Sequence, residues 1–134
     1  MHTYCITWPH CNIVSHGFIA YMSHVPCPIS PYHQSNKFPA GEIPFLAVPA
    51  LAAGNTVIVK PSEVTPLTGD MYCSALASAL PEGVLQVVQG DGKVGEQLVS
   101  SEDVHMIAMT GSSATGKKIM EKCAKNLKRL VLEL

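Results

Sequence analysis

A short apolar run and the charged residues that follow it decide the fold of this chain: residues 54–63 read GNTVIVKPSE. The β-branched run at 56–59 is typical of a buried strand. Gly54 and Asn55 form a stop-and-turn signal that ends the apolar, alanine-rich stretch before the strand. The pattern therefore predicts a buried strand that carries Lys60 and Glu63 just beyond its carboxyl end.

Strands and helices alternate after this first strand. Thr65 and Pro66 open a helix, as N-cap and first helical residue. Gly69 is expected to weaken this helix by about 1 kcal/mol relative to alanine. Its apolar face is predicted from a four-residue spacing of Leu67, Met71, Ala75 and Ala79. Further strands are predicted at 84–88, 105–109 and 130–132, and further helices at 94–99 and 114–126.

This alternation predicts parallel βαβ units with right-handed crossovers. The expected fold class is α/β, a partial Rossmann-like parallel sheet of about four strands and three helices, preceded by an irregular leader. With 134 residues the chain fits one domain at most.

The charges divide the chain into two parts. All Asp, Glu, Lys and Arg residues occur from Lys37 onward, and residues 1–36 contain none. We expect residues 1–36 to be a disordered leader and residues 37–134 to form the domain. The net charge of -1 gives no basic surface for nucleic acid. No secretory signal or membrane-spanning run is evident, so we expect a cytoplasmic protein.

A metal site was considered in the leader, where Cys5, His10, Cys11 and His16 lie close in sequence. Zinc sites usually contain a tight Cys-x2–4-Cys or His-x3–5-His pair. Neither pattern is present, although the spacing of His10 and His16 comes near the second. We therefore expect no metal ligands.

Two glycine patterns compete as phosphate-binding motifs. Residues 90–95 form a G-x-G-x-x-G that follows a strand and opens a helix. The dinucleotide fingerprint also requires an acidic residue about 20 positions later, and none lies near Met109 or Thr110. Residues 111–118 resemble the phosphate loop of NTPases, but Lys118 stands where a Mg²⁺-binding hydroxyl is needed. A plain glycine turn explains the first pattern equally well, and an anion-binding helix N-terminus explains the second.

The residues after the first strand offer a third candidate. In open parallel sheets, ligands bind beyond the carboxyl ends of the strands. Glu63 could accept hydrogen bonds from ribose hydroxyls, and Lys60 could donate one. The alternatives are a solvated lysine and a glutamate that the dipole of the next helix favours.

Several blocks of sequence together resemble the aldehyde dehydrogenase superfamily, in the order and spacing of that family. These blocks lie at 51–63 with Thr65 and Pro66, at 81–88 with Gly90, at 109–112 and at 132–134, and the resemblance covers about residues 38–134. It implies that residues 37–134 are part of an NAD(P)-binding domain, with intact relatives that form homo-oligomers.

The resemblance also implies roles for individual residues. Lys60 and Glu63 match residues that bind the adenosine ribose, Ser112 matches a serine near the pyrophosphate, and Gly90 lies beside the adenine end. The cofactor-binding set implied is Lys60, Ser62, Glu63, Gly90, Gly111, Ser112 and Thr115. Because Glu63 would repel a 2′-phosphate, NAD is favoured over NADP.

For catalysis, Glu133 matches the family's general base, which activates water to hydrolyse a thioester. The segment with the nucleophilic cysteine is not among these residues, and Cys73 and Cys123 are expected in the core. Lys37 stands where the family has the asparagine that stabilises the oxyanion. We therefore expect part of an oxidoreductase that converts an aldehyde to a carboxylic acid, inactive as this chain alone. A non-catalytic nucleotide-binding or interaction fragment and a phosphate-loop NTPase are the alternatives.

Overall fold

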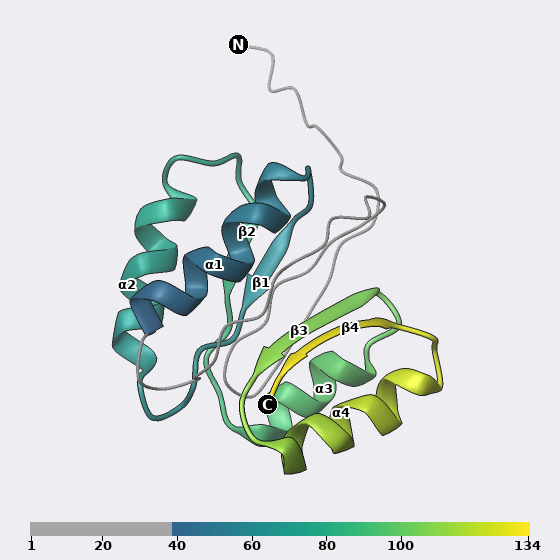
Figure 1. Cartoon of the computed structure of the whole chain (residues 1–134). Coiled ribbons are helices and arrows are strands. Elements are labelled where there is room, and N and C mark those ends of the chain that lie inside the picture. Colours follow the sequence, from purple (N-terminus) through teal and green to yellow (C-terminus); the bar gives the residue numbers. More distant parts are fainter. Residues whose placement is uncertain (1–38) are drawn as a thin grey trace.

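The computed structural model describes residues 39–134 (Figure 1). The expectations for the leader at 1–36 and for Lys37 lie outside these residues. Helices and strands alternate along the described part, as the sequence predicts. Their bounds are α1 Pro39–Ala52, β1 Val57–Val59, α2 Pro66–Ala77, β2 Leu85–Val87, α3 Gly92–Ser100, β3 Met106–Thr110, α4 Ser113–Ala124 and β4 Arg129–Glu133. The α/β fold class is confirmed.

The helix α1 was not among the three expected helices, so residues 39–134 contain four. It includes Pro44 and Pro49, each of which removes a backbone hydrogen bond. Helix formation nevertheless buries Ile43, Leu46, Ala47 and Ala50, which recur at helical spacing. Burial of this apolar face offsets what the prolines cost. The predicted stop after α1 is confirmed, because Asn55 Nδ2 donates to the Ala50 carbonyl at 2.7 Å.

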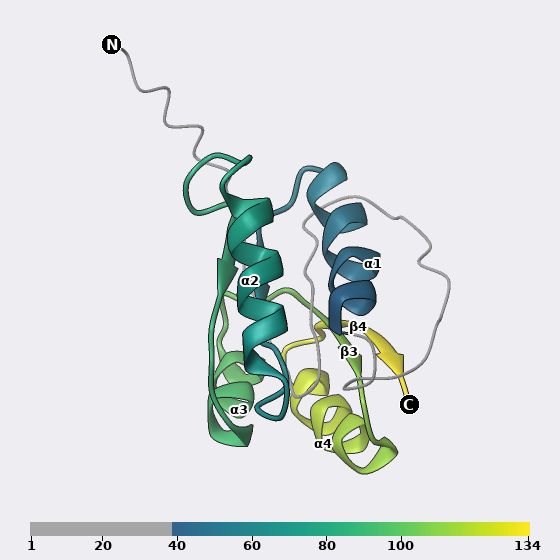
Figure 2. The ribbon, with the colours of Figure 1, turned by 90° about the vertical axis from the view of Figure 1, so that its left-hand side faces the viewer.

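All strand pairing in the described part is parallel, as expected, but the strands form two pairs rather than one four-stranded ladder. β1 pairs with β2, with Val57 opposite Leu85, and β3 pairs with β4, with Met106 opposite Arg129. Each pair has its own helices: α1 and α2 lie beside β1–β2, and α3 and α4 lie beside β3–β4 (Figures 1 and 2). β1 and β2 are only three residues long, so they offer few backbone groups for hydrogen bonds to the other strand pair.

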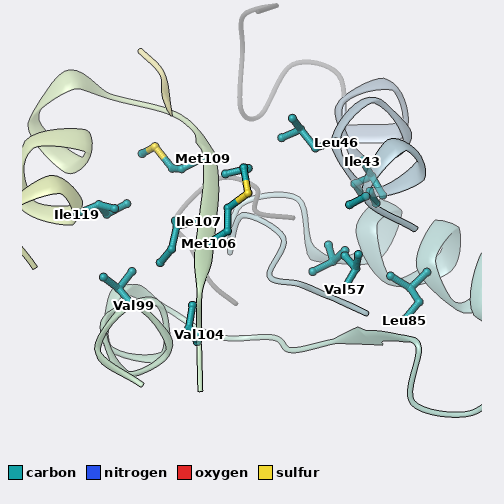
Figure 3. Packing of buried hydrophobic residues seen from close by; sticks show 14 of the residues in the cluster. Ile43, Leu46, Val57, Leu85, Val99, Val104, Met106, Ile107, Met109 and Ile119 are labelled. Carbon is teal, nitrogen blue, oxygen red and sulfur yellow. The ribbon is translucent and has the colours of Figure 1, made fainter. Parts of the chain in front are cut away.

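The core joins both halves through one cluster of buried apolar residues (Figure 3). Ile107 and Met109 of β3 contribute side chains that are almost fully buried. Cys73 and Cys123 belong to the same cluster, as predicted. Burial raises the pKa of the Cys73 thiol to about 12, and burial also raises the pKa of Cys123. Both thiols are therefore poor nucleophiles at neutral pH.

The predicted apolar face of α2 is wrong. Leu67 and Met71 are 75% and 72% exposed, whereas the buried residues of this helix are Gly69 and Cys73. The reason is close packing against the loop after β1. A Cβ atom at Gly69 would lie 2.5 Å from Pro61 Cγ, so only glycine fits without a shift. The residue expected to weaken the helix is thus the one that lets it pack.

No helix within residues 39–134 combines the length and the apolar character that crossing a membrane requires.

Candidate functional site

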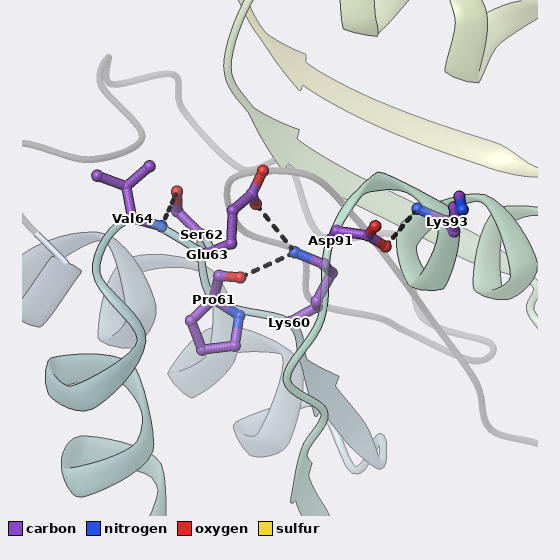
Figure 4. A network of polar contacts seen from close by, with 7 residues as sticks. All are labelled: Lys60, Pro61, Ser62, Glu63, Val64, Asp91 and Lys93. Atoms are coloured by element: carbon purple, nitrogen blue, oxygen red, sulfur yellow. Dashed lines mark hydrogen bonds and ion pairs between the residues drawn. The ribbon is translucent and has the colours of Figure 1, made fainter.

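Lys60 lies at the carboxyl end of β1 and is completely buried. Its Nζ atom donates to the Pro61 carbonyl at 3.0 Å and lies 3.6 Å from Glu63 Oε2 (Figure 4). Burial lowers the pKa of Lys60, and the charges of Glu63 and then Asp91 oppose that shift. A buried ammonium is stable only with such anionic partners. The loop therefore holds the Lys60 ammonium in a fixed place against Glu63, and the charge of Asp91 favours it further.

Glu63 differs from its partner because 53% of its side chain is exposed. Its Oε2 atom faces Lys60, while more than half of the side chain is exposed to solvent. Ser62 shapes the turn between them, since its Oγ accepts from the Val64 amide at 3.3 Å and its carbonyl accepts from the Thr65 amide at 3.0 Å. Glu63 thus presents an exposed acceptor that the buried Lys60 holds in place.

Asp91 acts on the same lysine from the turn between β2 and α3, and no motif in the sequence pointed to it. It is the N-cap of α3, and its Oδ1 accepts from the Lys93 amide at 2.9 Å. That hydrogen bond is the first cause that holds the pKa of Asp91 below its ordinary value. An aspartate before a predicted helix is an N-cap signal, which could have identified it. Parallel pairing places the ends of β1 and β2 together, as Val88 N donating to the Val59 carbonyl shows.

Gly90 makes this turn possible. A Cβ atom at Gly90 would lie 2.4 Å from Val94 Cγ2 in the first turn of α3. The glycine pattern at 90–95 is therefore needed for close packing between the turn and α3. No contact of Gly90 with a phosphate follows from this geometry.

Ser112 and Thr115 lie together at the N-terminus of α4. Ser112 is the N-cap, and its Oγ accepts from the Thr115 amide at 3.2 Å and lies 2.9 Å from Thr115 Oγ1. The Gly111 amide donates to the Glu133 carbonyl at 2.9 Å, so it is already engaged within the strand pair. The Ser113 and Ala114 amides also lie in the first turn of α4, where an α-helix supplies no backbone acceptor. This end of α4 suits an anionic group.

A pocket of about 600 Å³ lies between α3 and α4, and no motif in the sequence indicates it. Its volume falls within the range of small-molecule sites, about 300–1,000 Å³. Val99 and Ile119 supply apolar lining, and Gly92 and Thr115 place the pocket next to the two helix N-termini. We call it the α3–α4 pocket. An ion pair of 2.7 Å between Lys122 Nζ and Glu96 Oε1 links the two helices beside it.

Glu133 ends β4 and is only 6% exposed. Neither carboxylate oxygen has a hydrogen-bond partner within residues 39–134. A second glutamate, Glu42 in the first turn of α1, has a buried Oε1 atom without a partner in the same range. Burial first, and repulsion from Glu133 second, raise the pKa of Glu42 to about 7. Glu42 gave no motif signal, because only the tertiary fold brings it near Glu133.

The structure thus sorts the predicted site residues into three groups. Lys60, Ser62, Glu63 and Gly90 lie at the ends of β1 and β2; Gly111, Ser112 and Thr115 lie at the end of β3; Glu133 lies at the end of β4. The hydrogen bond from Gly111 to Glu133 joins the last two groups. Among residues 39–134, no three His, Cys, Asp or Glu side chains are placed to hold a metal.

Polar groups gather beyond the carboxyl ends of the parallel strands, the edge at which open α/β sheets bind their ligands. The chain belongs to the aldehyde dehydrogenase family, whose model matches residues 19–134. The family model matches from residue 19, whereas the motifs recognised in the sequence begin at about residue 38. The resemblance inferred from the sequence is therefore confirmed.

Individual relatives support this assignment. A D-glyceraldehyde dehydrogenase (NADP(+)) of Picrophilus torridus is 46% identical over 100 residues, 73% of this chain and 20% of the relative. The crystal structure of an aldehyde dehydrogenase from Bartonella henselae is 44% identical with a TM-score of 0.63, covering 65% of this chain and 19% of that one. A Mycobacterium tuberculosis aldehyde dehydrogenase complexed with NAD+ is 45% identical with a TM-score of 0.62, covering 64% and 18%. The chain spans about a fifth of the length of these curated relatives.

Proposed function

We propose that the described residues form the adenosine side of an NAD(P) site in an enzyme that oxidises an aldehyde to a carboxylic acid. The observation that carries the proposal is the buried Lys60 held against the half-exposed Glu63 at the end of β1. An exposed carboxylate fixed by a buried ammonium matches a pair of ribose hydroxyls, each of which can donate a hydrogen bond to it. The proposed cofactor and the proposed reaction are those of a full-length enzyme, of which this chain corresponds to about a fifth.

The surrounding geometry fits the remaining parts of a dinucleotide. The adenine ring would enter the α3–α4 pocket between Val99 and Ile119. The pyrophosphate would lie at the N-terminus of α4, where Ser112 and Thr115 offer hydroxyl groups beside the helix dipole. Gly111 would not donate to the pyrophosphate, because its amide already donates to the Glu133 carbonyl; it would instead shape the turn that leads into α4. Ser62 would act in the same way by fixing the loop between Lys60 and Glu63.

Glu63 also provides a basis for choosing between the two cofactors. A 2′-phosphate on the ribose would bring a second negative group against the Glu63 carboxylate. At about 4 Å, two like unit charges near a protein surface repel by about 4 kcal/mol. The proposed cofactor is therefore NAD, with NADP the weaker ligand. A relative at 46% identity is named for NADP(+), and a structure at 45% identity contains NAD+, so the preference needs a direct measurement.

In the proposed reaction, the bound cofactor accepts the hydride. Glu133 removes a proton from the water that hydrolyses the thioester, as its buried and unpartnered carboxylate allows. Neither Cys73 nor Cys123 can form that thioester, because burial raises the pKa of both thiols. We expect the 134-residue chain alone to bind the dinucleotide without oxidising aldehydes. A cytoplasmic location stays a prediction.

The test is calorimetric titration of the purified 134-residue chain with NAD and with NADP. We expect NAD to bind, and Glu63→Gln to weaken NAD binding about tenfold, as for the loss of a charged hydrogen bond of about 1.5 kcal/mol. The same variant should bind NADP more tightly than the original chain does. Glu82→Gln changes an exposed carboxylate away from the site and is the matched control. Absence of heat with both cofactors, in a chain shown to be folded by circular dichroism, would contradict the proposal.

A second candidate is a non-catalytic interaction role, which one observation favours. Val64, Leu67 and Met71 are each more than 70% exposed around the start of α2. Such a cluster is typical of a surface that docks on another chain. Capture of the 134-residue chain by an intact relative, lost on Leu67→Ser, would support this role. A chain that binds NAD but is not captured would leave only the first proposal.

A further inference from the structure

The end of β4 packs tightly against the beginning of α4. Gly116 lies one turn into α4 and is buried. A Cβ atom at Gly116 would lie 2.6 Å from Leu134 Cδ2 and 2.7 Å from Leu134 Cδ1, so the leucine side chain occupies the space that a larger residue would need. Figure 1 shows the carboxyl end of β4 beside the beginning of α4. The second glycine of the pattern that resembles a phosphate loop is therefore needed for close packing.

A second contact joins the same two elements. The Gly111 amide donates to the Glu133 carbonyl at 2.9 Å, which continues the parallel pairing of β3 with β4 into the turn before α4. The Gly116 amide in turn donates to the carbonyl of the N-cap, Ser112, at 2.9 Å. The turn that carries Ser112 is therefore held at both ends, at Gly111 by the backbone of β4 and at Gly116 by the Leu134 side chain.

We propose that Leu134 is a positioning residue, which through its contact with Gly116 holds the N-terminal turn of α4 in place against β4 and thereby supports binding of the cofactor pyrophosphate. The second part of this inference rests on the proposed role of that turn in the NAD(P) site. Leu134 directly follows Glu133, so the same contact also links the proposed base to the proposed pyrophosphate site. Small displacements of groups that orient a ligand weaken binding and catalysis, so a fixed geometry matters here.

Hydrogen exchange, followed by nitrogen-15 NMR, tests the contact without any cofactor. The Gly116 amide is bonded to the Ser112 carbonyl, and the Gly95 amide makes the equivalent bond to the Asp91 carbonyl at the start of α3, at 3.2 Å. We expect Leu134→Ala to speed exchange of the Gly116 amide about tenfold relative to the Gly95 amide, because the first turn of α4 then opens locally. A leucine that only stabilises the whole fold would change both amides by the same factor, and that result would overturn the proposal.

A double-substitution cycle tests the close packing through the sign of its effect. Alanine normally stabilises a helix relative to glycine, but at Gly116 the new methyl group would meet the Leu134 side chain. Gly116→Ala should therefore lower the midpoint of urea unfolding in the original chain. Leu134→Ala removes the side-chain atoms nearest to that methyl group, so in the Leu134→Ala chain Gly116→Ala should raise the midpoint. The same sign in both chains would overturn the proposal, because the two residues would then act independently.

Calorimetric titration with NAD tests whether the position of this turn matters for binding. At a temperature at which all variants are folded, Leu134→Ala should weaken NAD binding about tenfold. The matched control is Leu76→Ala, which removes a half-buried leucine that packs on the same core from α2. It should lower the urea midpoint and leave the NAD affinity unchanged.

An NAD affinity that Leu134→Ala leaves unchanged would overturn the role of Leu134 in binding. If the original chain itself does not bind NAD, the proposed function fails. The ratio of exchange rates and the reversal of sign in urea need no cofactor, so they still decide whether Leu134 holds the N-terminal turn of α4.

Discussion

Replacing Glu42 by glutamine should remove much of the pH dependence of folding stability between about pH 4.5 and 7. The pKa of Glu42 is raised from 4.5 to about 7 in the folded chain. In this range the unfolded chain loses the proton and the folded chain keeps it, so the folded state binds more protons. Stability must then fall as the pH rises, and level off above pH 7. Below pH 4.5 the Glu42 carboxyl is protonated in both the folded and the unfolded chain, so its ionisation costs no stability there.

The size of this effect follows from the same shift. A change from 4.5 to about 7 corresponds to about 3.4 kcal/mol if fully expressed. Glu42 is only half-buried, and solvent screening lowers the expected value to about 1–2 kcal/mol. Glu42→Gln should therefore stabilise the chain by about 1–2 kcal/mol at pH 8, and by little at pH 4.

Urea unfolding of the 134-residue chain at pH 4, 6 and 8, followed by circular dichroism, measures these differences. The control is Glu82→Gln, which removes an exposed carboxylate and should change the unfolding midpoint little at any pH. The reasoning is refuted if Glu42→Gln and the original chain show the same fall in stability from pH 4 to 8. A variant destabilised equally at every pH would also refute it, because that pattern indicates lost packing.

Three further substitutions test the packing and the buried cations. Gly69→Ala should destabilise the chain by about 1–2 kcal/mol in urea despite its better helix propensity, because the new Cβ meets Pro61. Lys128→Met should lower the free energy of unfolding by about 2–3 kcal/mol, because the carbonyls of Val99 and Ser101 lose the buried ammonium that donates to both. The control is Lys117→Met on the surface, which should change the urea midpoint little. Lys60→Met should leave the urea midpoint equal or higher while calorimetry shows NAD binding weakened about tenfold, since a buried charge is exchanged for an apolar chain of similar length.

The sequence was sufficient for the strands and for the polar residues at their ends. A run such as Val57–Val59 has only one plausible place in an α/β fold, and parallel pairing then brings its end beside that of the next strand. Helix faces were less predictable. On α2, spacing of large apolar residues selected Leu67 and Met71, but the tight contact with Pro61 required a glycine there instead. Large side chains mark a buried face only where space exists for them.

The residues missed in the candidate site share a physical cause. The charge of Asp91 acts on the pKa of Lys60, and the charge of Glu133 acts, after burial, on the pKa of Glu42. Each partner comes from a different element, and no spacing along the chain connects the two members of either pair. Burial then strengthens interactions that would be weak in water. The chemistry of this edge therefore depends on which charges the fold brings together: the buried Lys60 with the exposed carboxylates of Glu63 and Asp91, and the half-buried Glu42 with Glu133. The first group contains a cation, whereas the second contains only carboxyl groups, so burial and the charge of Glu133 both raise the pKa of Glu42.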